Sequence, residues 1–316
     1  MTRTILPPGI HYGISPSLYH ADPCEAPSLS SSLARKILRE SPAHAFASSP
    51  RLDPGFVPEV KKTYDLGTAA HTAVLSAGES IRVMGFGNWR SKEARRQRDE
   101  ARAEGYTPLL EKEAAEVLAM AAKVKTALKR IGLPEAFSDP SRAEVVAIAE
   151  VEGVQCRAMA DYVGADGFLY DLKTTTSAHY DAVTQSIVAF GYHIQHEHYL
   201  DTFRAAGMAL KGMRFVFVEK NRPHCVSVIA LDEAFIDIGR SQTSLARKTW
   251  RRCLATGEWP DYAHPGIVEI SPPIWMASQV EDRSHTLQAL TPRGKAKPSA
   301  IAAALSIEIA SGGAST

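Results

Sequence analysis

The hydrophobic residues in the first 130 positions recur mostly every three or four residues, which is the spacing of amphipathic helices. The pattern predicts helices over Ser32–Arg39, Lys62–Ser76 and Glu111–Arg130. Ser30–Ser32 offer N-cap side chains for the first helix, and Gly132 with Pro134 ends the third. The first part of the chain is therefore predicted to consist of helices joined by loops.

The pattern then changes to short segments of strand-forming residues. Strands are predicted over Glu144–Val151, Gln155–Val163 and Phe168–Thr174. Glu152–Gly153 and the segment Gly164–Gly167 separate them, and both are typical turn sequences. These three strands are expected to form an antiparallel meander.

After the meander the chain returns to helical spacing. A long helix is predicted over Tyr180–Ala206, then strands over Arg214–Glu219 and Val226–Leu231, and a last helix over Glu233–Thr256. Phe190 and Tyr192, in the long helix, are expected to face the core. Beyond Pro272 the sequence is rich in Ala, Ser, Gly, Lys and Pro, so residues 273–316 are expected to be a disordered tail. Residues 1–272 are predicted to form one domain, with a helical and loop region at 1–60 and a core at 61–256.

Composition places the chain among ordinary globular proteins. Of its 316 residues, 45% are hydrophobic and 22% charged, which is enough to build a sizeable core. No apolar run approaches the roughly 20 residues of a membrane span, and Met1–Tyr12 does not resemble a signal peptide, so a cytoplasmic location without membrane contact is expected. The four cysteines are far apart and form no CxxC pair, which argues against a zinc ribbon or a disulfide framework.

The net charge of +1 conceals basic segments at Arg90–Arg102 and Arg247–Arg252. Such runs are usually solvated helix faces, and they are compatible with a polyanionic partner without requiring one.

The most informative charges lie in the third strand of the meander. Side chains alternate along a strand, so Asp171 and Lys173 project from one face while Leu172 points into the core. A turn centred on Asp166 would set Asp161 opposite Asp171. Two adjacent carboxylates repel unless a cation or a shared proton intervenes, so a divalent metal bound through oxygens, Mg²⁺ or Mn²⁺, is indicated. The alternative is a solvated cross-strand face, since a bare D-x-K is short and common.

The segments around these charges resemble a known group. "RAMADYV" (Arg157–Val163), "YDLKTT" (Tyr170–Thr175) and "QHEHY" (Gln195–Tyr199) are similar to the motifs of the PD-(D/E)xK nuclease superfamily. The resemblance is to its RecE-type exodeoxyribonuclease branch, which is related to phage lambda exonuclease and the RecB nuclease domain. Further similar segments follow in the same order: Tyr19–Ala45, Leu66–Leu75, Arg90–Leu109 and Phe215–Val228.

The resemblance implies an α/β, restriction-endonuclease-like fold, with a mixed central sheet flanked by helices and an N-terminal helical region. It also implies the roles of the site residues. The implied metal ligands are His71, Asp161, Asp171 and the Leu172 carbonyl, and Lys173 is the implied catalytic lysine. Gln195 and Tyr199 match a Q-x-x-x-Y helix motif, and their spacing puts both on one helical face, where they contact the scissile phosphate or brace the ligands.

Other polar residues are weaker candidates. Arg90 and Lys92 are expected to hold DNA phosphates. Glu144 either reaches the metal or lies at a sheet edge, and Glu219 is expected to be an edge charge. The spacing of His193, His196 and His198 does not put all three on one helical face, which argues against a zinc site.

The function implied is a Mg²⁺-dependent 5′-to-3′ exonuclease that acts on double-stranded DNA ends in phage or prophage recombination. It would work as a ring-shaped homo-oligomer beside a single-strand annealing protein. Two alternatives stay open: a nuclease with another polarity or substrate, such as single-stranded DNA or a flap, and a non-catalytic DNA-binding accessory protein.

Overall fold

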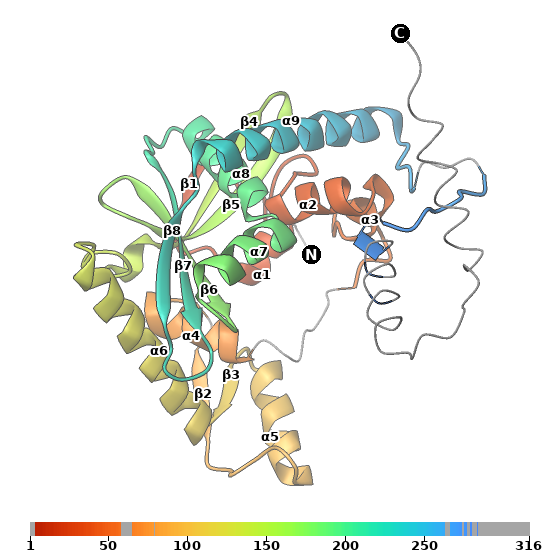
Figure 1. Cartoon of the computed structure of the whole chain (residues 1–316). Helices are drawn as coiled ribbons and strands as arrows, with labels where there is room; N and C mark the ends of the chain where they lie inside the picture. Colours follow the sequence, from red (N-terminus) through yellow and green to blue (C-terminus); the bar gives the residue numbers. More distant parts are fainter. Residues whose placement is uncertain are drawn as a thin grey trace, which may run out of the picture. The chain divides into compact units, whose positions relative to one another are not determined.

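The computed structural model describes residues 4–57, 65–78, 80–262, 266–273, 275–276, 279 and 283. The chain divides into two units, Met1–Ala263 and His264–Thr316, and the first unit contains both sheets (Figure 1). The predicted tail, residues 273–316, falls almost wholly outside the described residues. None of the described helices is long and apolar enough to cross a membrane.

The central sheet has six strands in the order β1-β4-β5-β6-β7-β8. The strands are β1 Gly9–His11, β4 Ala143–Val151, β5 Val154–Val163, β6 Phe168–Thr175, β7 Gly212–Glu219 and β8 Val226–Ala230. Neighbours are antiparallel except β6 and β7, which run parallel. The β4–β5 turn is Glu152–Gly153, where both residues have positive φ, as a two-residue hairpin turn requires. The predicted mixed sheet and its antiparallel meander are confirmed.

The connection between the parallel strands β6 and β7 corrects one prediction. The single helix expected over Tyr180–Ala206 is two helices, α7 Tyr180–Phe190 and α8 Tyr192–Ala205. Gly191 separates them with φ +64°, and its N–H caps the end of α7. A Cβ at Gly191 would lie 3.1 Å from the Arg35 side chain, so glycine suits both the conformation and the space.

The remaining predicted helices are confirmed. They are α2 Ser31–Arg39, α4 Asp65–Leu75, α6 Glu111–Arg130 and α9 Glu233–Thr256. The Ser30 hydroxyl caps α2 by accepting the Leu33 N–H, as the sequence indicates. Residues 62–64, at the predicted start of α4, lie outside the described residues.

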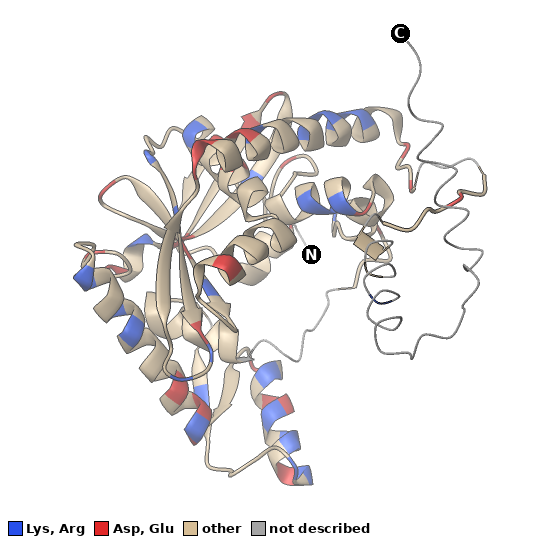
Figure 2. Cartoon of the chain, in the orientation of Figure 1, with Lys and Arg blue, Asp and Glu red and all other residues tan. Residues whose placement is uncertain are grey.

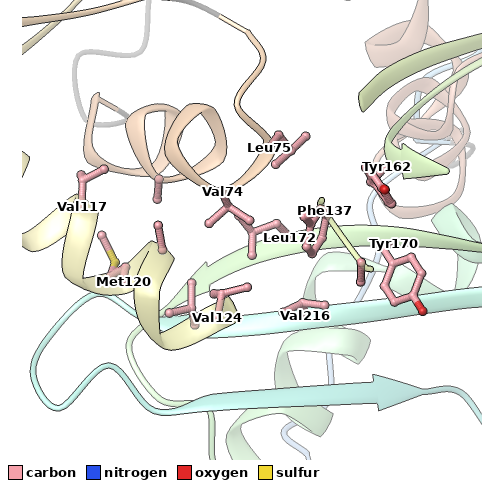
Figure 3. Close-up of a cluster of buried hydrophobic side chains, with 14 of the residues drawn as sticks. Val74, Leu75, Val117, Met120, Val124, Phe137, Tyr162, Tyr170, Leu172 and Val216 are labelled. Carbon is pink, nitrogen blue, oxygen red and sulfur yellow. The ribbon is translucent and has the colours of Figure 1, made fainter. Parts of the chain in front are cut away.

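Helices cover both faces of the central sheet (Figure 1). On one face α4 and α6 pack through Val74, Met120 and Val124 against Leu172 and Val216 of β6 and β7 (Figure 3). On the other face α7 and α8 pack against the opposite side of the same strands. There α2 and α9 join α8 in a further cluster around Trp250. Alternating side chains thus give β6 two different environments, one in the apolar cluster with α4 and α6 and one beneath α8.

Several short elements were not predicted, because segments of three to six residues carry too little periodicity. They are β1, α1 Pro16–His20, α3 Pro42–Ala47, β2 Ile81–Met84 and β3 Thr107–Leu110. The strands β2 and β3 pair in parallel, and α5 Lys92–Ala103 connects them. The basic run of the sequence forms this helix, whose surface mixes basic and acidic side chains (Figure 2).

Candidate active site

The candidate site lies where strands β5 and β6 separate. Their pairing is limited to Tyr162 with Tyr170 and Val163 with Leu169, which is the register predicted from a turn centred on Asp166. Further along β5, Leu29 occupies the position beside the strand that β6 would otherwise fill. Its N–H donates to the Gln155 carbonyl, and its carbonyl accepts from the Arg157 N–H. We call the gap between β5 and β6 the fork. The fork frees backbone groups of β6 to meet side chains instead of a neighbouring strand.

Asp161 closes the mouth of the fork. Its Oδ2 accepts a hydrogen bond from the backbone N–H of Leu172 over 2.7 Å. The Leu172 side chain is fully buried on the α4–α6 face, as predicted. Because the N–H and C=O of a strand residue point to the same side, the Leu172 carbonyl also faces the fork.

Asp171 and Lys173 occupy the other face of β6, beneath α8. Asp171 is 2% exposed, and its carboxylate forms an ion pair with the Lys173 ammonium. The same carboxylate accepts a hydrogen bond from the side-chain amide of Gln195 on α8. The expected meeting of Asp171, Lys173 and Gln195 is therefore present in the structure.

Helix α4 brings His71 to the site. Gly67 lies one turn earlier, where a Cβ would contact the Thr174 hydroxyl of β6 at 3.4 Å, so α4 runs close to the strand. His71 Nδ1 lies 3.5 Å from Asp161 Oδ2. The imidazole is partly exposed and faces the carboxylate that closes the fork.

The electrostatics of the fork are dominated by the two carboxylates. Burial and the negative charge of Asp171 raise the pKa of Asp161 to about 6, although His71, Lys173 and the Leu172 N–H oppose the rise. Burial disfavours the charge on Lys173, yet Asp171 and Asp161 together raise the pKa of its ammonium. When both carboxylates are ionised they carry two negative charges, and the Lys173 ammonium offsets one of them.

Tyr199 lies one helical turn after Gln195 and is 8% exposed. Burial, with the charges of Asp171 and Asp161 adding to it, raises the pKa of its hydroxyl well above the usual value. Tyr199 is therefore a neutral side chain at pH 7, packed in the cluster beneath α7 and α8.

The donor set fits a hard divalent cation. Two carboxylates and a strand carbonyl supply oxygen ligands, and the raised pKa of Asp161 reflects negative charge that a metal would neutralise. Among the residues described, no three His, Cys, Asp or Glu side chains form a ready-made metal cluster. Binding a metal would therefore require the carboxylates of Asp161 and Asp171 to turn toward each other, with His71 beside them.

The two weaker acidic candidates lie in different surroundings. Glu144 leaves the β4–β5 ladder at the position opposite Asp161, with φ +50°, and its carboxylate lies beside Gly78. Glu219 accepts backbone N–H groups of Ala178 and Cys225, so it holds two loops together. It is thus a structural charge.

The histidines of α8 diverge, as their spacing indicates. His193 bonds to Gln242, His196 to Glu197, and His198 to the Arg157 carbonyl. The DNA-contact candidates Arg90 and Lys92 are exposed at the start of α5, on the small β2–β3 unit and not in the fork.

Sequence reasoning missed the contribution of Tyr192. It was expected in the core, and its ring does stack on Phe215, with centroids 5.6 Å apart. The ring is also partly exposed, and the Lys173 ammonium lies 4.8 Å from its centroid. The expectation for Phe190 is wrong, because this side chain is 56% exposed. The spacing of two between Phe190 and Tyr192 is the signal that was overlooked, because residues i and i+2 of a continuous helix do not share one face.

The fold and the fork define a class: an acid pair and a lysine on adjacent, separating strands of a mixed sheet are the hallmark of PD-(D/E)xK proteins. The chain belongs to the family described as "PDDEXK-like domain of unknown function (DUF3799)", whose model matches residues 30–269.

One solved structure supports the same fold. A putative exonuclease from Eubacterium rectale is similar over 85% of this chain and 99% of its own, with a TM-score of 0.54 and 10% identity. A phage-related exonuclease from Haemophilus somnus 129PT matches over 73% of this chain and 96% of its own, with a TM-score of 0.32 and 14% identity. No curated protein matches the chain.

Proposed function

We propose that the protein is a metal-dependent deoxyribonuclease that hydrolyses DNA phosphodiester bonds. The observation that carries this proposal is the meeting of Asp161, Asp171 and Lys173 at the fork, with Gln195 bonded to Asp171. Buried acids beside a lysine are costly unless they serve a cation and a negatively charged substrate.

Asp161, Asp171 and the Leu172 carbonyl would hold Mg²⁺, or Mn²⁺ in its place, with His71 completing the site. When bound, the metal supplies an activated water for attack on the phosphorus and stabilises the departing 3′-oxygen.

The protein side chains have separate tasks. The Lys173 ammonium, now paired with Asp171, would contact a non-bridging phosphate oxygen of the bound DNA, where its charge would stabilise the transition state. Gln195 holds the Asp171 carboxylate in one orientation. Tyr199, neutral and buried, braces α8 over the site.

We propose the finer activity from the resemblance to RecE-type enzymes. The substrate is a double-stranded DNA end, degraded from 5′ to 3′ in phage or prophage recombination. A ring-shaped homo-oligomer would hold the DNA, and a single-strand annealing protein would take up the strand that remains. Arg90 and Lys92, on the exposed start of α5, would contact backbone phosphates outside the fork.

The test is digestion of linear DNA labelled at either the 5′ or the 3′ end, with Mg²⁺ or with a chelator. Asp171→Asn and Lys173→Met probe the site. Asp181→Asn and Lys220→Ala change exposed residues and serve as matched controls. Release of the 5′ label that requires Mg²⁺, is lost in both site variants and persists in both controls would support the proposal.

Other outcomes identify the alternatives. Release of the 3′ label, or digestion of only single strands or flaps, would keep the nuclease and replace the proposed polarity or substrate. DNA binding without cleavage under any divalent metal would instead favour a non-catalytic accessory protein.

A further inference from the structure

An exposed aromatic side chain lies close to the candidate catalytic lysine, joined to it through one further ring. Phe190, the last residue of α7, is 56% exposed, and its ring stacks on Tyr192 at 5.7 Å between centroids with an interplanar angle of 27°. Tyr192 in turn lies under the Lys173 ammonium. A row of aromatic rings thus runs from Phe215 in the core, through Tyr192 at the catalytic lysine, to Phe190 at the surface.

Two arginines hold the backbone that carries Phe190. Arg35 donates to the Phe190 carbonyl over 2.8 Å, and Arg39 donates to the carbonyls of Val188 and Ala189. Both arginines come from α2 and hold the last turn of α7 in place. Positive charge therefore lies at two points near the aromatic row, with the guanidinium groups at the end of α7 and the Lys173 ammonium over Tyr192.

This combination of an apolar ring and nearby cations matches one ligand class. Proteins bind unpaired nucleotides by stacking bases on aromatic rings while positive side chains track the phosphates. Aromatic and arginine side chains also occur in protein interfaces, so the deciding observation is the Lys173 ammonium over Tyr192, at the position proposed for a phosphate. The charge pattern around Phe190 therefore favours a nucleotide.

Resting on the proposed nuclease function, we propose that Phe190 is a stacking platform for the base of a nucleotide next to the scissile phosphate. The phosphate lies at Lys173, and the adjacent base extends over Tyr192 to the Phe190 face. The platform would hold the strand in register with the fork, so that each phosphate in turn reaches the metal ligands.

The test is an abasic scan. Single-stranded oligonucleotides carry one abasic nucleotide at successive positions, and their binding to the full-length protein is measured in chelator, where no hydrolysis is expected. Wild type, Phe190→Ala and Phe190→Trp are compared. Leu245→Ala is the matched control, because Leu245 on α9 is 55% exposed.

In the wild type we expect one position at which loss of the base weakens binding by about 5- to 150-fold, the range that base–aromatic stacking supports. In Phe190→Ala the intact oligonucleotide should bind more weakly by a similar factor, and the abasic position should have no further effect. Phe190→Trp and Leu245→Ala should behave like the wild type.

Two results would overturn the inference. The first is a scan that is the same in the wild type and Phe190→Ala, and the second is a change of oligomeric state in Phe190→Ala, which would assign the ring to contact with a second copy. In both cases Mg²⁺-dependent cleavage by the wild type would remain. Failure of the nuclease proposal is distinct, because it would appear as the absence of cleavage by the wild type with any divalent metal, whether or not the oligonucleotide binds.

Discussion

Asp161 accepts the backbone N–H of Leu172 over 2.7 Å at the point where the β5–β6 ladder has already ended. One carboxylate oxygen therefore replaces a strand–strand hydrogen bond. This makes Asp161 a structural residue and a candidate metal ligand at once, and substitutions can separate the two roles.

Asp161→Asn keeps an oxygen that accepts the Leu172 N–H but removes the negative charge. Removing a residue that only hydrogen-bonds to a metal ligand typically lowers activity by about 10- to 100-fold. Removing a ligand itself should therefore reduce nuclease activity by more than about 100-fold. Stability should change little. Asp161→Ala should lose the same activity and also about 1–3 kcal/mol of unfolding free energy, because it leaves a backbone donor unpaired. Urea unfolding alongside the cleavage assay measures both, and equal stability of the two variants would refute the structural role.

Gln195 tests how far activity depends on the orientation of Asp171. Gln195→Ala removes the amide that donates to the Asp171 carboxylate, and we expect activity to fall by about 10- to 100-fold with a higher Mg²⁺ concentration at half-maximal rate. Gln185→Ala, at an exposed position of α7, is the control. If excess Mg²⁺ leaves both variants as active as the wild type, Gln195 is a packing residue only.

The N-terminal segment depends on a buried ion pair. Arg157 on β5 bonds to the carbonyl and hydroxyl of Ser28, and its guanidinium lies 3.2 Å from the fully buried Asp22. Asp22→Ala should destabilise the protein by about 3–5 kcal/mol, because it leaves a buried guanidinium without its counter-charge. The double variant Asp22→Ala with Arg157→Met should recover part of this loss. A double-mutant cycle by chemical denaturation measures the coupling, and simple additivity would show that the pair contributes nothing beyond its packing.

The antiparallel meander and the shared face of Asp171 and Lys173 were predictable because both depend on local patterns. Alternation placed Leu172 in the core and Asp171 with Lys173 opposite, and the turn centred on Asp166 fixed the register. The fork was not predictable. It depends on Leu29, more than 120 residues away in the sequence, replacing β6 beside β5.

The error at residue 191 has a similar physical origin. The hydrophobic residues of α7 and α8 follow one helical spacing, and glycine inside a helical pattern is usually tolerated at a modest cost. The close approach of the Arg35 side chain to Gly191 is a tertiary contact, which the local sequence does not reveal.

The buried imidazole of His198 should make the free energy of unfolding depend on pH. Burial lowers the pKa of its imidazole to about 4, and the charges of Arg247, Arg157 and Arg35 act in the same direction, although the hydrogen bond to the Arg157 carbonyl opposes them. An unfolded histidine has a pKa near 6.5, so above that pH both states are neutral and His198 contributes nothing. Between pH 6.5 and 4 the unfolded state binds a proton that the folded state does not. The free energy of unfolding therefore decreases as the pH is lowered, by about 3 kcal/mol in total.

His198→Gln keeps a donor for the Arg157 carbonyl and removes the titrating group. We expect its unfolding free energy to fall less steeply between pH 6.5 and 4 than that of the wild type, although its stability at pH 7.5 is lower. His179→Asn, at the exposed N-cap of α7, should leave the slope unchanged. Urea unfolding at half-unit pH intervals gives the three curves. If wild type and His198→Gln run parallel across this range, His198 is protonated in the folded state as readily as in the unfolded chain, and its burial does not govern acid sensitivity.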